Sequence, residues 1–171
     1  MSKVIVVCGR SGVGKTTLAR ALSRKMSIFC IHKDEMKEPL YELLGGKSLE
    51  DSNNIGRYSM ELLFRLAENA IKTGIDVIVE APFWHPSNPN IFVHWKKNLN
   101  ADVRIIICSL IDDSERVRRK QERERHHSHH DNDRFPEIGS PDYSPMPDPK
   151  LVLDMSAPPA ELVEKSLAFI E

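Results

Sequence analysis

The stretch VIVVCGRSGVGKTTLARAL, residues 4–22, joins a continuous apolar run to a glycine-rich turn and then to a segment with helical periodicity. It contains the pattern GxxxxGKT, which begins at Gly9 and ends at Thr16. Glycines in such a turn let backbone N–H groups point at phosphate oxygens, and the following helix adds its positive end. A strand before the pattern and a helix after it favour a phosphate-binding P-loop over a glycine turn without a ligand.

Each residue type in this loop has an expected role. We expect Lys15 to place its charge on the β- and γ-phosphates and the Thr16 hydroxyl to bind Mg²⁺. Thr17 adds a hydroxyl for the α-phosphate. The predicted nucleotide-binding residues are Gly9, Arg10, Ser11, Gly12, Val13, Gly14, Lys15, Thr16 and Thr17. The motif predicts a bound nucleoside triphosphate, but kinases, motors and switches all share it.

Five short runs rich in valine and isoleucine predict strands buried on both faces, because the runs are continuous rather than alternating. They are Lys3–Cys8, Ile28–His32, Asp76–Glu80, Val103–Ser109 and Leu151–Asp154. Helical periodicity covers Lys15–Met26 and Arg57–Thr73, and Gly74 suits the end of the second helix. The alternation of strands and helices indicates an α/β fold with a parallel sheet, and the length suggests one domain over residues 1–171.

Composition limits the class of partner. Lysine and arginine number 24 against 25 acidic residues, so no overall basic field favours bulk binding to nucleic acid or a membrane. The cysteines Cys8, Cys30 and Cys108 lie in or beside apolar runs without a disulfide or zinc spacing, which predicts buried thiols in a reducing compartment. The apolar run Val4–Cys8 is too short for a signal peptide, so we expect a cytoplasmic protein.

Acidic residues follow the second and third predicted strands. The carboxyl ends of parallel strands form the binding crevice, so Asp34 should face the γ-phosphate, where a carboxylate can accept the proton of an attacking hydroxyl. Asp34 can also cap the next helix, with Pro39 in the first turn. Glu80 ends the third strand and is the acid expected to hold Mg²⁺ through water.

Other side chains near this edge are candidate contacts for the phosphoryl acceptor. Lys37 can offset charge on the acceptor or on the transferring group. Trp84, with Phe83 and His85, can wall the acceptor pocket or pack under the loop HPSNP. The predicted acceptor-binding residues are Asp34, Lys37, Arg57 and Trp84.

A charged segment, residues 112–134, interrupts the strand–helix alternation. Arg116, Arg119 and Arg123 lie on one helical face, which favours a lid that brings positive charge to the transferring phosphoryl group. The alternative is a solvated charged helix. Residues 135–149 contain five prolines, which exclude a helix or an inner strand and indicate a connector.

The lid runs into ERERHHSHHD, residues 122–131, which contains His126, His127, His129 and His130. No carboxylate or cysteine at a familiar zinc spacing accompanies them, which argues against a metal site. We therefore expect the imidazoles at a helix end, where they suit the negative terminus and can hydrogen-bond a phosphate or the acceptor.

These stretches together resemble the small AAA-like P-loop kinases grouped with polynucleotide kinase, zeta toxin and chloramphenicol phosphotransferase. The likeness is carried by GRSGVGKTT (9–17), KDEMKEPLYELLG (33–45), VIVEAPF (77–83), the arginine-rich segment running into ERHHSHHD (124–131), and LVLDMSAPPAELVEKSLAFI (151–170). It covers nearly the whole chain.

The resemblance implies a three-layer fold with a five-stranded parallel sheet in the order 2-3-1-4-5, ATP with Mg²⁺, and transfer of the γ-phosphoryl group to a hydroxyl. It implies that Lys15, Asp34, Arg119 and Arg123 are catalytic and that Ser156 belongs to a segment, 156–159, that covers the adenine. The family's polynucleotide kinase branch often has arginine where this chain has Lys37, which weakens the case for a nucleic-acid end.

We therefore expect an ATP-dependent kinase of a hydroxyl-bearing small molecule, such as a nucleoside or a sugar. One alternative is a polynucleotide 5′-hydroxyl kinase, and another is an ATP-binding switch without an acceptor.

Overall fold

The computed structural model describes residues 1–122, 126–130 and 141–171. Five parallel strands form one sheet in the order β2-β3-β1-β4-β5, which confirms the predicted topology. The strands are β1 (Lys3–Gly9), β2 (Phe29–His32), β3 (Val77–Glu80), β4 (Asp102–Ser109) and β5 (Lys150–Asp154). Each begins and ends within one residue of its predicted bounds, because turn residues and charged residues flank every apolar run.

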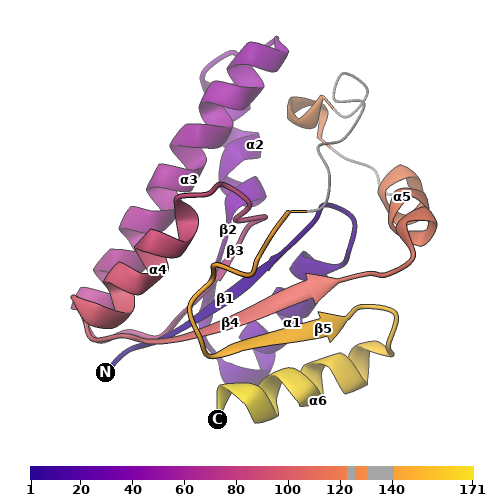
Figure 1. Ribbon diagram of the computed structural model, residues 1–171. Helices are drawn as coiled ribbons and strands as arrows, with labels where there is room; N and C mark the ends of the chain where they lie inside the picture. Colours follow the sequence, from indigo (N-terminus) through magenta and orange to yellow (C-terminus); the bar gives the residue numbers. More distant parts are fainter. Residues whose placement is uncertain (123–125, 131–140) are drawn as a thin grey trace.

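Helices cover both faces of this sheet, with α3 and α4 on one face and α1 and α6 on the other (Figure 1). The helices are α1 (Lys15–Met26), α2 (Lys33–Leu43), α3 (Leu49–Lys72), α4 (Asn88–Lys97), α5 (Asp113–Glu122) and α6 (Pro159–Ile170), and a short 3₁₀ helix, η1, spans His127–His129. The predicted helix 57–73 begins earlier, at Leu49, because Ser48 caps it. The Ser48 hydroxyl accepts from the Asp51 N–H, and the Asp51 carboxylate accepts from the Ser48 N–H.

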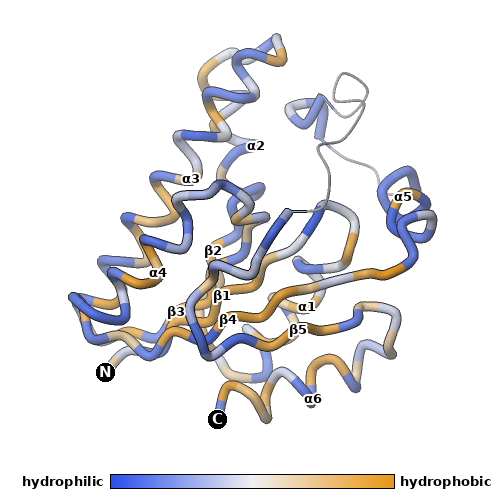
Figure 2. The backbone as a smooth tube through the Cα atoms, viewed as in Figure 1, coloured by the Kyte–Doolittle hydropathy of each residue, from blue (hydrophilic) through white to orange (hydrophobic). Residues whose placement is uncertain are grey.

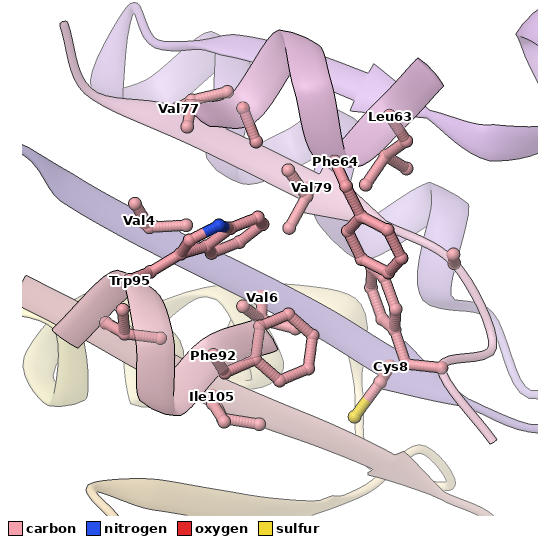
Figure 3. Close-up of a cluster of buried hydrophobic side chains, with 14 of the residues drawn as sticks. Val4, Val6, Cys8, Leu63, Phe64, Val77, Val79, Phe92, Trp95 and Ile105 are labelled. Atoms are coloured by element: carbon pink, nitrogen blue, oxygen red, sulfur yellow. The ribbon is translucent and has the colours of Figure 1, made fainter. Parts of the chain in front are cut away.

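The core lies on the two faces of the sheet, and Figure 2 shows the apolar residues concentrated in the central strands. On the α3/α4 face, aromatic rings pack among aliphatic side chains of the sheet and of α3 (Figure 3). The Phe83 ring lies edge-on to Phe92, with centroids 5.2 Å apart, and Phe92 lies edge-on to Trp95. The sequence left open whether these aromatic side chains wall an acceptor pocket or pack in the interior. Phe83 packs in the interior, whereas Trp84 is 54% exposed.

The described part of the proline-rich connector, residues 141–149, is irregular as predicted. The Tyr143 hydroxyl donates to the Pro82 carbonyl across 2.6 Å, and Met146 is buried in the aromatic core, so this segment closes over the end of β3. No helix within the described residues is both long enough and apolar enough to span a membrane.

All three thiols are expected to be unreactive in the folded protein. Burial raises the pKa of Cys30 and of Cys108 to about 12 and that of Cys8 still further above its usual range. At pH 8 a thiol with a pKa of about 12 is ionised in only about one molecule in 10⁴, and the thiolate is the reactive form. A chromogenic disulfide reagent should therefore react at least about tenfold more slowly with the native protein than with the protein in denaturant. A thiol that reacts equally fast in both states would contradict this prediction.

Candidate active site

The P-loop, residues 9–16, connects β1 to α1 at the carboxyl edge of the sheet. Gly14 caps α1 in a left-handed conformation, with φ 105°. Gly12 has φ 87°, and a Cβ added there would lie 2.8 Å from the carbonyl oxygen of Arg116. The loop thus needs glycine both for its turn and because α5 packs directly on it.

Lys15 and Thr16 point toward the end of β3. The Lys15 ammonium donates to the Arg10 carbonyl at 2.9 Å and lies 3.9 Å from Oε1 of Glu80. The Thr16 hydroxyl donates to Oε2 of Glu80 at 3.1 Å. Hydroxyl and carboxylate oxygens are the ligands that Mg²⁺ prefers, so this pair fits the predicted magnesium site.

His32 is a member of this group that the sequence did not reveal. It ends β2 directly opposite Glu80 in the sheet, and its Nδ1 lies 3.0 Å from Oε2 of Glu80. Both side chains are buried, so the imidazole fixes the orientation of the carboxylate. The sequence did show that both residues end predicted strands. It could not show that the register of β2 against β3 places them side by side.

Asp34 lies in the first turn of α2, two residues beyond His32, at the carboxyl end of β2. Its Oδ1 accepts from the Lys33 ammonium at 3.2 Å, and 42% of its side chain is exposed. The alternative role as a helix cap is wrong, because the N-cap is His32 and Pro39 lies inside the helix. The positive end of α2 favours a carboxylate at this position.

Lys37 lies elsewhere than expected. It is 1% exposed, and its ammonium donates to the Ser52 hydroxyl at 2.7 Å and to the Ser128 carbonyl at 2.9 Å. It therefore joins α2 to α3 and to residues 126–130. The sequence had predicted that this ammonium would contact the acceptor.

Arg57 and Trp84 are both exposed. Arg57 donates to the side-chain oxygen of Asn54 at 3.0 Å, within α3. The acceptor role of both residues stays a prediction.

Arg116 hydrogen-bonds the P-loop backbone. The sequence had placed it on an accessible helical face with other arginines. It is 3% exposed and donates to the Ser11 carbonyl at 3.1 Å and to Asp113 at 2.8 Å. Asp113 also accepts from Arg10 at 2.7 Å. The hydrogen bond from Arg116 is the main reason that the pKa of Asp113 lies below its usual value.

Arg119 faces a cavity of about 400 Å³ beside the P-loop. Its guanidinium donates to Glu115 at 2.6 Å and to the Met155 carbonyl at 3.3 Å. The cavity is also lined by Val13, Gly14, Thr17, Ser156, Ala157 and Pro158, so the predicted adenine-covering segment lies beside the P-loop. Hydrogen bonds from Arg118 and then Arg119 lower the pKa of Glu115 to about 2. Arg123 falls outside the described residues.

The histidine segment, residues 126–130, packs against α2 and α3. Ser128 is fully buried, and its carbonyl accepts from Lys37 and, at 2.6 Å, from the Ser52 hydroxyl. His129 is also buried, with Nε2 2.9 Å from Oε1 of Glu38. All four histidines lie in the separate turn η1 or directly beside it, and residues 123–125, which join this turn to α5, lie outside the described residues.

The chain is similar to known proteins in both sequence and structure. A family profile described as an AAA domain matches residues 4–137, well over half of the chain, and includes the P-loop, Asp34, Glu80 and α5. The chain belongs to this family of small P-loop kinases. A protein named a probable adenylyl-sulfate kinase from Archaeoglobus fulgidus is 36% identical over 89 residues, which are 49% of this chain and 57% of that relative. The chain thus matches little more than half the length of this curated relative.

Solved structures share the fold over almost the whole chain. A proposed kinase from Chloroflexus aurantiacus superposes with a TM-score of 0.85 at 22% identity and covers 99% of both chains. The APS kinase of Mycobacterium tuberculosis, solved with AMPPNP and APS, superposes with a TM-score of 0.62 at 18% identity and covers 99% of this chain and 97% of its own. At these identities the structural likeness establishes the fold.

Proposed function

We propose that the protein transfers the γ-phosphoryl group of ATP to a hydroxyl of a small molecule. The observation that carries this proposal is the grouping, at one edge of the sheet, of a P-loop, an oxygen pair suited to Mg²⁺ (Thr16 and Glu80) and an exposed carboxylate (Asp34). A switch needs the first two, whereas phosphoryl transfer also needs a group that activates the acceptor.

The nucleotide site follows from the P-loop and the adjacent cavity. Backbone N–H groups of residues 10–15 are suited to bind the phosphates, and Lys15 supplies a cation to the β- and γ-phosphates. The cavity lined by Val13, Thr17, Arg119 and Ser156 supports a base-binding role for that space. Thr16 and Glu80 would hold Mg²⁺, which supplies charge neutralisation to the phosphate oxygens when bound.

Asp34 is proposed to orient the acceptor hydroxyl and to accept its proton as its oxygen attacks the γ-phosphorus. The bond between that phosphorus and the β–γ bridging oxygen breaks, and ADP leaves with the electron pair. Arg119, which donates to the Met155 carbonyl beside the cavity, is proposed to stabilise charge on the phosphates during this transfer.

Two observations support a small acceptor. The histidine segment occupies the junction of α2 and α3, the side of the site where Asp34 lies, and Lys37, Ser52 and Glu38 hold it there. We take this packing against α2 and α3 to favour a small acceptor over a polynucleotide end with several phosphates. The named activity of the Archaeoglobus relative and the APS bound in the Mycobacterium structure are also consistent with small acceptors.

The proposal is tested by incubating the protein with γ-labelled ATP and a panel of nucleosides, sugars, adenylyl sulfate and 5′-hydroxyl oligonucleotides. We expect label on a small acceptor, at a rate that changes little between low and high salt. Labelling confined to oligonucleotides, with affinity falling steeply as salt rises, would instead identify a polynucleotide kinase. ATP binding without transfer to any acceptor would favour a switch.

Replacing Arg119 with alanine should lower kcat by about tenfold or more while weakening ATP binding less, because the guanidinium is proposed to act mainly on the transition state. Arg118→Ala is the matched control, since Arg118 pairs with the same Glu115 on the exposed side of α5. Steady-state kinetics and ATP titration of both variants check this. Normal turnover by Arg119→Ala would remove Arg119 from the mechanism, and a loss of ATP binding as large as the loss of kcat would assign it to the base-binding cavity that it lines.

A further inference from the structure

Three potential metal ligands meet outside the P-loop site, where the histidine segment touches the end of α2. Nε2 of His126 lies 3.2 Å from Oε1 of Glu42, and Nε2 of His127 lies 3.0 Å from the same oxygen. All three ligand atoms lie within 4.8 Å of one another. We propose that Glu42, His126 and His127 form a binding site for a transition-metal ion of the Zn²⁺ type.

The spacing of these atoms fits such an ion. Zn²⁺ binds imidazole nitrogen and carboxylate oxygen at about 2.0–2.2 Å in tetrahedral geometry, which places neighbouring ligand atoms about 3.3 Å apart. The two nitrogen–oxygen separations, 3.2 and 3.0 Å, lie within a few tenths of an ångström of that value. Three protein ligands leave a fourth position, which water can fill because Glu42 and His127 are exposed.

The surroundings of His126 supply the outer contact that a metal-binding imidazole requires. With a metal on Nε2, the ring hydrogen resides on Nδ1 and needs an acceptor. The Ser128 hydroxyl lies 2.9 Å from Nδ1 and can accept it. Without metal, the Ser128 backbone N–H donates to Nδ1 across 3.2 Å, so metal binding would exchange this bond for the hydroxyl contact.

The neighbouring contacts position the backbone of the histidine segment and the two histidine rings. Lys37 and Ser52 both donate to the Ser128 carbonyl, which fixes the backbone between the paired histidines. The Tyr41 ring lies edge-on to His126 and His127, with centroids 6.4 and 5.5 Å away. The carboxylate ligand thus comes from α2. It is far from the histidine run in the sequence, so the spacing of residues in that run does not reveal it.

A metal ion at this position would fasten the histidine segment to the helix that carries Asp34. α2 contributes Asp34 in its first turn and Glu42 in its last. Occupancy of the site would therefore favour the arrangement in which the segment covers the junction of α2 and α3. Such an ion would have a structural role, separate from the Mg²⁺ expected at the P-loop.

The test is a Zn²⁺ titration of the full chain, freed of any affinity tag and of metal, against a chromophoric chelator. We expect one equivalent to bind to the wild type and at least tenfold weaker binding to Glu42→Gln and to His127→Ala. Co²⁺ bound to the wild type should show the strong visible absorption of tetrahedral coordination, and Zn²⁺ should raise the melting temperature of the wild type but not of Glu42→Gln.

Matched controls distinguish a specific metal site from adventitious binding to surface side chains. His94→Ala and Glu61→Gln remove one exposed histidine and one exposed acid from α4 and α3, and both should bind Zn²⁺ as the wild type does. Equal affinity in the wild type and Glu42→Gln, or an equal loss in the controls, would overturn the proposal. Because Glu42→Gln changes an exposed side chain, it stays informative even if His127→Ala fails to fold.

Discussion

Replacing Lys15 with alanine should lower phosphoryl transfer by about 10³-fold or more while leaving the fold intact. The ammonium lies in the first turn of α1, between the Arg10 carbonyl and Glu80, where it is available to the β- and γ-phosphates. Its loss removes a cation that is proposed to neutralise the charge on the transferring group. Alanine favours the helix, and Glu80 keeps its bonds to Thr16 and His32.

The experiment compares Lys15→Ala with Lys25→Ala, which removes an exposed lysine from the last turn of the same helix. Initial rates with γ-labelled ATP give the transfer activity, and a thermal melt reports the fold. Lys25→Ala should behave as the wild type does. Full activity in Lys15→Ala would refute the assignment of the P-loop as the site of transfer.

The sheet and the phosphate site could be predicted because local sequence specifies them. A strand buried on both faces is a continuous apolar run, and the P-loop places its glycines, Lys15 and Thr16 within eight consecutive residues. The start of α3 was missed because its first two turns, residues 49–56, are mostly polar. The Ser48–Asp51 capping box was the available signal.

The acceptor side was predicted less well because distant segments build it. Lys37 was expected to face a substrate, but Ser128, 91 residues later in the chain, lies over it. The four histidines looked alike in the sequence, yet the fold gives them different partners: Glu42 for His126 and His127, Glu38 for His129 and Tyr41 for His130. Such pairings depend on how the chain returns across the sheet, which no local pattern encodes.

Replacing Asp34 with asparagine should reduce transfer by about 10²-fold or more and leave ATP binding nearly unchanged. The carboxylate lies beyond the end of β2, beside the strand that carries Glu80, and is partly exposed, so an acceptor hydroxyl can reach it. Asparagine keeps the shape and a hydrogen-bonding oxygen but cannot take up the proton. The loss should therefore appear in kcat rather than in the dissociation constant for ATP.

Glu35→Gln is the matched control, because Glu35 follows Asp34 in the same turn but forms an exposed ion pair with Arg20 at 2.6 Å. It should change the transfer rate by less than about threefold, since exposed pairs contribute little. The acceptor identified in the labelling screen is the substrate, and calorimetry gives ATP affinity for both variants. If Asp34→Asn transfers phosphate at the wild-type rate, Asp34 is not the base; if it loses ATP binding as well, its role is to shape the nucleotide site. Only a selective loss of transfer distinguishes an acceptor kinase from a nucleotide switch at this position.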